Sequence, residues 1–186
     1  MHKLKKLGVV IAVFALSAIG AASASAAQFT ASATGSITGK ATDTQVFTTN
    51  GGQVKCSVAA SSGTIKSTAT AEQTVEVKVS GCTAFGFVNT HVTPIQVNFT
   101  ASGEVHLENT VTITPTGAGC TQSVAPQTVK STGYSNNAGK VKVTPNVTGI
   151  TYTSTGGLCG SSGANGTLTG TNEVERVGGG SLSFDP

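Results

Sequence analysis

The sequence contains no tryptophan and only two tyrosines, Tyr134 and Tyr152, among its 186 residues. Aromatic rings supply the large, rigid contact area on which many sugar-binding platforms and glycosidase clefts depend. Their scarcity therefore argues against an aromatic sugar-binding platform, although recognition of a sugar through polar groups remains open.

Charged residues are also few, at 10% of the chain. Lys3, Lys5 and Lys6 are three of the eleven basic residues, and all eight acidic residues lie beyond residue 26. The chain from residue 27 onward consequently carries eight basic and eight acidic side chains and is formally neutral. Formal neutrality gives no support for a basic patch that would bind nucleic acid or an anionic membrane surface, so neither is an expected partner.

The first 26 residues have the pattern of a secretory signal peptide. Basic residues precede an apolar run from Leu7 to Ile19, which is too short to span about 30 Å of hydrocarbon. The small residues 24–26 predict cleavage after Ala26. We therefore expect residues 27–186 to form one exported domain without a membrane span. No lipid-attachment cysteine follows the cleavage position, so we expect release into the medium or noncovalent association with the cell wall.

Four cysteines, Cys56, Cys82, Cys120 and Cys159, all lie in the exported part. An even count in an oxidising compartment predicts two disulfides, with three possible connectivities. The loop lengths favour Cys56–Cys82 and Cys120–Cys159, although geometry decides. No two cysteines have the spacing of a zinc knuckle, so we expect disulfides in place of a metal site.

Apolar and polar residues alternate in short runs separated by glycine, asparagine and proline, which is typical of half-buried strands. The runs 75–79, 95–99 and 105–107 each place apolar residues on one face. Eight to ten strands are too many for one open sheet to bury well. We therefore predict an all-β fold, an antiparallel β-sandwich of two packed sheets stapled by the disulfides.

Residue types that catalyse reactions are present but scattered. His91 and His106 are the histidines of the exported part, and Asp43 and Asp185 are its aspartates. A serine hydrolase would need nucleophile, imidazole and carboxylate brought together, yet no Gly-x-Ser-x-Gly motif occurs. His106 is expected on the polar face of its strand, where it is interpreted as a solvated histidine.

Pairs of carboxylates are the remaining candidates for chemistry. His91 and His106 could form a metal site if Glu104 or Glu108 supplied a further ligand. Glu173 with Glu175, and Glu104 with Glu108, have the same-face spacing of a strand. Neighbours on one strand are the wrong arrangement for a glycosidase, which places its carboxylates on either side of the scissile bond. We expect no catalytic residue, no metal site and no cofactor.

The segments 46–56, 80–86 and 149–160, which contain three of the four cysteines, resemble a family of small exported actinobacterial proteins of unassigned function. The resemblance covers most of the exported chain and implies location and scaffold only.

Two functions are considered. The first is a secreted non-enzymatic binding or structural module with an unknown extracellular or envelope partner. The alternative is a small secreted hydrolase with a dispersed site at His106 or His91.

Overall fold

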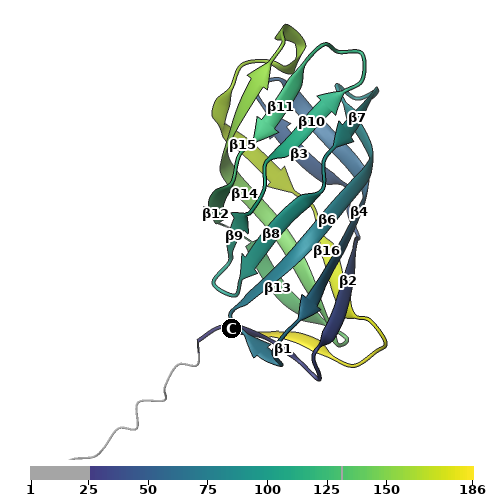
Figure 1. The fold of residues 1–186 in the computed structure, drawn as a ribbon, viewed down its shortest axis with the longest axis vertical. Coiled ribbons are helices and arrows are strands. Elements are labelled where there is room, and N and C mark those ends of the chain that lie inside the picture. Colours follow the sequence, from purple (N-terminus) through teal and green to yellow (C-terminus); the bar gives the residue numbers. More distant parts are fainter. Residues whose placement is uncertain (1–25, 131) are drawn as a thin grey trace, which may run out of the picture.

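The computed structural model describes residues 26–130 and 132–186 (Figure 1), so the predicted signal peptide lies outside the described residues except for Ala26. Nearly all of the described chain is in strands, and the one helical segment in it is the short 3₁₀ turn η1 (Gly157–Cys159). The strands are β1 (Gln28–Ala31), β2 (Gly35–Ala41), β3 (Gln45–Thr49), β4 (Gly52–Ile65), β5 (Ala69–Thr70), β6 (Glu72–Ala84), β7 (Val88–Val92), β8 (Ile95–Thr100), β9 (Glu104–Leu107), β10 (Val111–Pro115), β11 (Thr121–Val124), β12 (Gln127–Lys130), β13 (Thr132–Asn137), β14 (Lys140–Thr155), β15 (Gly163–Thr169), β16 (Asn172–Arg176) and β17 (Leu182–Asp185).

The strands belong to one large antiparallel sheet and one small one. The small sheet has the order β17-β1-β5, and the large sheet runs from β12 through β6, β14 and β4 to β16. Additional pairings of β4 with β6 and of β14 with β16 link distant parts of the large sheet, which curls so that its strands face one another across a core (Figure 1). The predicted all-β, antiparallel, disulfide-stapled fold is confirmed, with sandwich-like packing of opposing strands.

The described strands outnumber the eight to ten expected. Short strands rich in threonine, serine and glutamine, such as β5 and β11, contain too few apolar residues to show an alternating pattern. Pro94, which lacks a backbone N–H, lies in the two-residue gap between β7 and β8. The local sequence therefore predicts the strands that have an alternating apolar pattern. It misses the short polar strands, which form because neighbouring strands pair with them.

In β6 and β14, two of the three longest strands, the alternation of inward and outward side chains shifts by one residue partway along the strand. In β6 the apolar residues 75, 77 and 79 face inward, but beyond Gly81 the inward positions are Cys82 and Ala84. Gly81 has a φ of 60°, a conformation that glycine adopts without strain. Gly149, with a φ of 76°, plays the same part in β14, where the register shifts between Val147 and Ile150.

The core consists of two apolar clusters, one in each half of the elongated molecule. One contains Val54, Val111, Ile113, Val124, Val147, Ile150 and Tyr152, and the other contains Ile37, Ile65, Val75, Val97, Val105, Val141, Val143 and Leu182. The disulfide Cys56–Cys82 joins residues directly opposite each other on β4 and β6, inside the first cluster. The disulfide Cys120–Cys159 ties the segment before β11 to η1. Both bridges have the connectivity that the loop lengths favour.

A search of the described residues for a helix long and apolar enough to cross a membrane found none.

Candidate functional site

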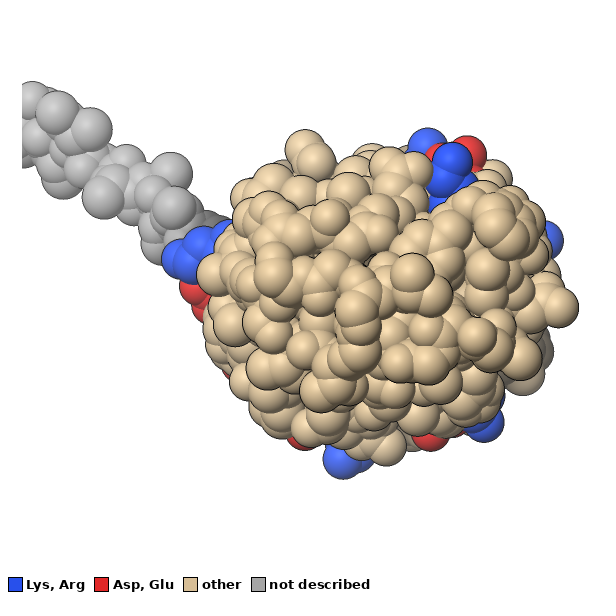
Figure 2. Space-filling model, turned by 90° about the horizontal axis from the view of Figure 1, so that it is seen from above, with Lys and Arg blue, Asp and Glu red and all other residues tan. Residues whose placement is uncertain are grey.

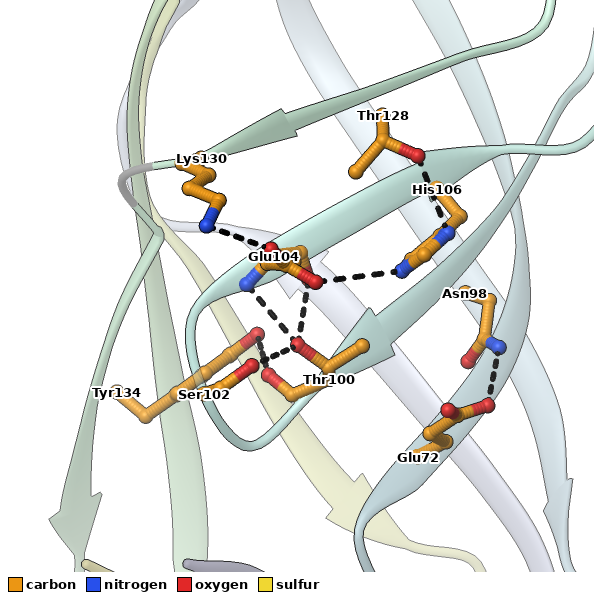
Figure 3. A network of polar contacts seen from close by, with 9 residues as sticks. All are labelled: Glu72, Asn98, Thr100, Ser102, Glu104, His106, Thr128, Lys130 and Tyr134. Carbon is orange, nitrogen blue, oxygen red and sulfur yellow. Dashed lines mark hydrogen bonds and ion pairs between the residues drawn. The ribbon is translucent and has the colours of Figure 1, made fainter.

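The first candidate site is a polar cluster on the outer face of β8, β9 and β12 (Figure 3). His106 lies opposite Asn98 on one neighbouring strand and opposite Thr128 on the other. Because side chains alternate along a strand, the inward positions of β9 are Val105 and Leu107, which belong to the core clusters or pack against them. His106 therefore lies on the polar face, where the sequence places it.

Contacts in this outer cluster connect a hydroxyl, an imidazole and a carboxylate. The Nδ1 atom of His106 lies 3.2 Å from Oγ1 of Thr128, and its Nε2 atom lies 3.8 Å from Oε2 of Glu104. The other carboxylate oxygen, Oε1 of Glu104, accepts a hydrogen bond of 2.8 Å from Lys130. Threonine, not serine, is the hydroxyl residue that the fold brings to His106.

Lys130 stabilises the ionised form of the Glu104 carboxyl group. The hydrogen bond from Lys130, together with its positive charge, keeps the pKa of the Glu104 carboxyl below its usual value, and the same contact raises the pKa of Lys130. Solvent surrounds both groups, so the ion pair adds little to the stability of the fold. The carboxylate is thus ionised at neutral pH and shared between Lys130 and the imidazole.

The geometry meets only part of the requirement for a nucleophilic site. In a catalytic triad the imidazole takes the proton of the hydroxyl while a carboxylate holds its other N–H in a hydrogen bond. The contact between hydroxyl and imidazole is present at His106. The distance of 3.8 Å between Nε2 of His106 and Oε2 of Glu104, however, is too long for a hydrogen bond. His106, Glu104 and Thr128 line neither of the two cavities inside the described part of the sheet. The cluster therefore has the parts of a hydrolase on an outer face, outside both of these cavities.

The other predicted candidates lie apart from this cluster. His91 is on β7, opposite Thr114 of β10, and no group of three potential metal ligands occurs among the described residues. Glu173 and Glu175 share one cation, Lys140, whose Nζ lies 2.8 Å from a carboxylate oxygen of each. Hydrogen bonding to Lys140 lowers the pKa of Glu173. These carboxylates bind a lysine and do not face each other across a cleft.

The remaining sequence candidates also have structural contacts. Asp185 accepts a hydrogen bond from Thr30 within the small sheet, and the backbone carbonyl of Asp43 accepts one from Gln45. Neither contact brings a carboxylate to a histidine.

The second candidate site is one end of the molecule, which we call the loop end. It consists of the turns 49–52, 85–87, 116–120 and 156–162, and none of these segments contains a lysine, arginine, aspartate or glutamate. Seen from above, this end is a broad surface with charged atoms only around its margin (Figure 2). Two of its apolar side chains are strongly exposed, Phe87 at 81% and Leu158 at 64%.

Close contacts between glycines and neighbouring backbone occur where the turns 49–52, 116–120 and 156–162 meet. A Cβ atom added to Gly51 would collide with the carbonyl oxygen of Cys159, and one added to Gly156 would collide with that of Gly119. The disulfide Cys120–Cys159 crosses the same region. The loop end is therefore a packed surface, and glycine is required where its turns meet.

Hydrogen bonds from Tyr152, Asn165 and Gln122 support the turns 49–52 and 156–162. The Tyr152 hydroxyl accepts a hydrogen bond of 2.8 Å from the Asn50 amide and donates one of 3.2 Å to Oδ1 of Asn165. Nδ2 of Asn165 donates to Oδ1 of Asn50 at 2.7 Å. The buried Gln122 side chain donates to the carbonyl of Cys159 at 3.0 Å and to the Thr49 hydroxyl at 2.9 Å.

Sequence reasoning missed these loop-supporting roles. The alternating pattern places Tyr152 on a strand, but its hydroxyl partners come from residues 102 positions earlier and 13 positions later in the chain. The one available signal was the absence of charge over residues 109–129 and 143–172, two long segments that meet at the loop end.

Searches of protein-family models, of curated proteins and of solved structures found no match to this chain.

Proposed function

We propose that this protein is a secreted, non-enzymatic binding module of the cell exterior and that its loop end contacts an uncharged partner. The observation that carries the proposal is the combination of exposed Phe87 and Leu158 with four charge-free turns at a single end. The cores of protein interfaces are depleted in charge and enriched in aromatic side chains. Exposed apolar side chains grouped in this way favour binding over a purely structural role.

The scaffold suits recognition by preformed loops. Binding residues on many proteins lie on loops that a rigid sheet positions. Here a disulfide and the hydrogen bonds of Tyr152 and Gln122 order the turns 49–52, 116–120 and 156–162 before any partner arrives. Less conformational entropy is then lost on binding. The exposed side-chain amides of Asn50 and Asn165, which bond to each other at the loop end, supply hydrogen-bonding groups for a neutral polar partner, such as a glycan of the envelope.

An exported location supports the same proposal. The signal-peptide pattern of residues 1–26 predicts export, and both disulfides are of the kind that persists in an oxidising compartment. We also propose membership of the small exported actinobacterial family, on the cysteine-containing segments that resemble it. Release or noncovalent wall association follows as the expected location.

The experiment is to fractionate producing cells into medium, wall and membrane and to mix the purified protein with isolated wall material under nonreducing conditions. The proposal predicts saturable co-sedimentation that soluble wall fragments compete away. Recovery of all protein in the supernatant at every wall concentration would contradict an envelope partner.

The contact between Thr128 and His106 favours a second candidate, a small secreted hydrolase. Its test is hydrolysis of chromogenic esters by the purified protein beside the variants Thr128→Val and His106→Ala. A hydrolase at this cluster predicts turnover that both substitutions abolish. Equal rates for the three proteins would assign any turnover to a contaminant or to another site.

A further inference from the structure

A cavity of about 190 Å³ lies inside the sheet, between the two core clusters. Most of its lining consists of valine, isoleucine, leucine and phenylalanine side chains contributed by strands on opposite sides of the molecule. A second cavity of about 60 Å³ shares Val77, Phe99, Val143 and Asn172 with it. Protein interiors normally contain few voids larger than a water molecule, so a space of this size requires an explanation.

Several partly buried core side chains line this cavity. Seven apolar residues that pack against the first core cluster are partly buried, and all seven line the cavity: Phe47, Val79, Val92, Ile95, Leu107, Val129 and Leu168. A ligand in the cavity would therefore contact apolar side chains from several strands.

The chemistry of the lining excludes charged ligands and disfavours water. None of the described residues that line the cavity is charged. The amide of the buried Gln45 side chain donates to the carbonyls of Asp43 and Thr171, and Asn172 donates to the Gln45 side-chain oxygen. Water needs two to four polar partners to occupy a cavity, whereas a dry apolar cavity of about 150 Å³ takes up benzene.

The wall beside the cavity has a seam between β12 and residues 146–152 of β14. β12 pairs with β9, and no backbone ladder joins it to β14 in the part of the chain that the structure describes. The Gln127 side chain forms hydrogen bonds across this seam. Gln127 donates from Nε2 to the carbonyl of Thr151 at 2.8 Å and accepts from the Thr151 amide at 2.9 Å. Gln127 also lines the cavity.

We propose that the cavity binds a small, neutral, apolar molecule about the size of benzene, which enters through the seam that the Gln127 side chain closes. Two hydrogen bonds from one side chain are a weaker closure than a backbone ladder, so the seam opens more readily than the rest of the wall. This site is separate from the loop end and does not depend on the function proposed for it.

The test of binding is titration of the purified protein, labelled at its isoleucine, leucine and valine methyl groups, with benzene in an NMR experiment. Saturable shifts are expected at Ile113, Ile150 and Leu107, which line the cavity, while Leu158 at the loop end stays unchanged. The absence of saturable shifts, or shifts confined to Leu158, would overturn the proposal.

Cavity-filling variants test whether benzene binds in this cavity. Ala59 lines the cavity and is 2% exposed, whereas the adjacent Val58 points outward and is 50% exposed. Ala59→Leu should weaken benzene binding about tenfold, the effect of losing roughly two methylene groups of burial, while Val58→Leu leaves it unchanged. Should Ala59→Leu fail to fold, Val97→Leu provides the same test with a smaller addition. Unaltered affinity in the folded filling variant would place benzene elsewhere and refute the site.

The seam is tested through exchange rates. Gln127→Ala removes both bonds to Thr151 and should speed benzene exchange about tenfold. Gln96→Ala, which removes an exposed glutamine side chain on β8, is the matched control. Equal exchange rates in the two variants would show that access lies elsewhere.

Discussion

Removal of the Cys120–Cys159 disulfide by the double substitution Cys120→Ala and Cys159→Ala should destabilise the protein strongly. The bridge spans 39 residues, and the chain-entropy relation gives about 4 kcal/mol for a loop of that length. One kcal/mol lowers the Tm of a domain of this size by about 2–4 °C, so we expect a decrease of about 8–16 °C. Urea and thermal unfolding, followed by circular dichroism without reductant, measure the loss.

The matched control is Cys56→Ala with Cys82→Ala, which removes a bridge of 26 residues worth about 3.5 kcal/mol in the same relation. Both losses should be similar in size, but only the first variant should loosen the loop end. Hydrogen exchange of the Asn50 amide, which is bonded to Tyr152, reports that loosening. A loss below about 1 kcal/mol in the first variant, or equal protection of Asn50 in both, would refute this reasoning.

Filling the cavity by Ala59→Leu should raise the free energy of unfolding by up to about 2 kcal/mol, because a buried methylene contributes about 0.8 kcal/mol. Urea unfolding beside Val58→Leu measures this, and a loss above about 1 kcal/mol would indicate a close-packed site. The pKa of Glu173 is lowered by Lys140, so this group stabilises the fold above the ordinary glutamate pKa and that contribution is lost as pH falls through the lowered value. Carboxyl NMR titration should show the Glu173 pKa rising in Lys140→Met, and an unchanged pKa would contradict the assignment. Tyr152→Phe should cost about 1–3 kcal/mol in thermal unfolding, because its hydroxyl joins two partners, and a cost below about 0.5 kcal/mol would show that it does not support the turns.

Much of the scaffold could be predicted because its information is local. Alternation in the runs 75–79 and 105–107 identified core strands, and the spacing of the cysteines favoured the observed pairing. The same alternation placed His106 on the outer face beside Glu104, as the structure does. These features depend on the period of a strand and on loop length, and both are visible in one sequence.

The candidate sites could not be predicted because long-range pairing creates them. The bonds of Gln127 to Thr151 cross a seam between two strands and join residues that are 24 positions apart in the chain. The contact of Gly51 with Cys159 depends on how two distant turns pack. A cavity depends on the side-chain volumes that many strands contribute together, and no sequence motif predicts it.

The most direct test of the binding module is to place a charge on its loop end and measure the binding of each variant to isolated wall material under nonreducing conditions. Leu158→Lys alters an apolar side chain that is 64% exposed at the loop end, and Val177→Lys alters one that is 55% exposed between β16 and β17. We predict saturable binding for the unmodified protein and for Val177→Lys, with binding lost in Leu158→Lys. Identical binding by all three proteins, or by none, would contradict the loop end as the binding surface for an envelope partner.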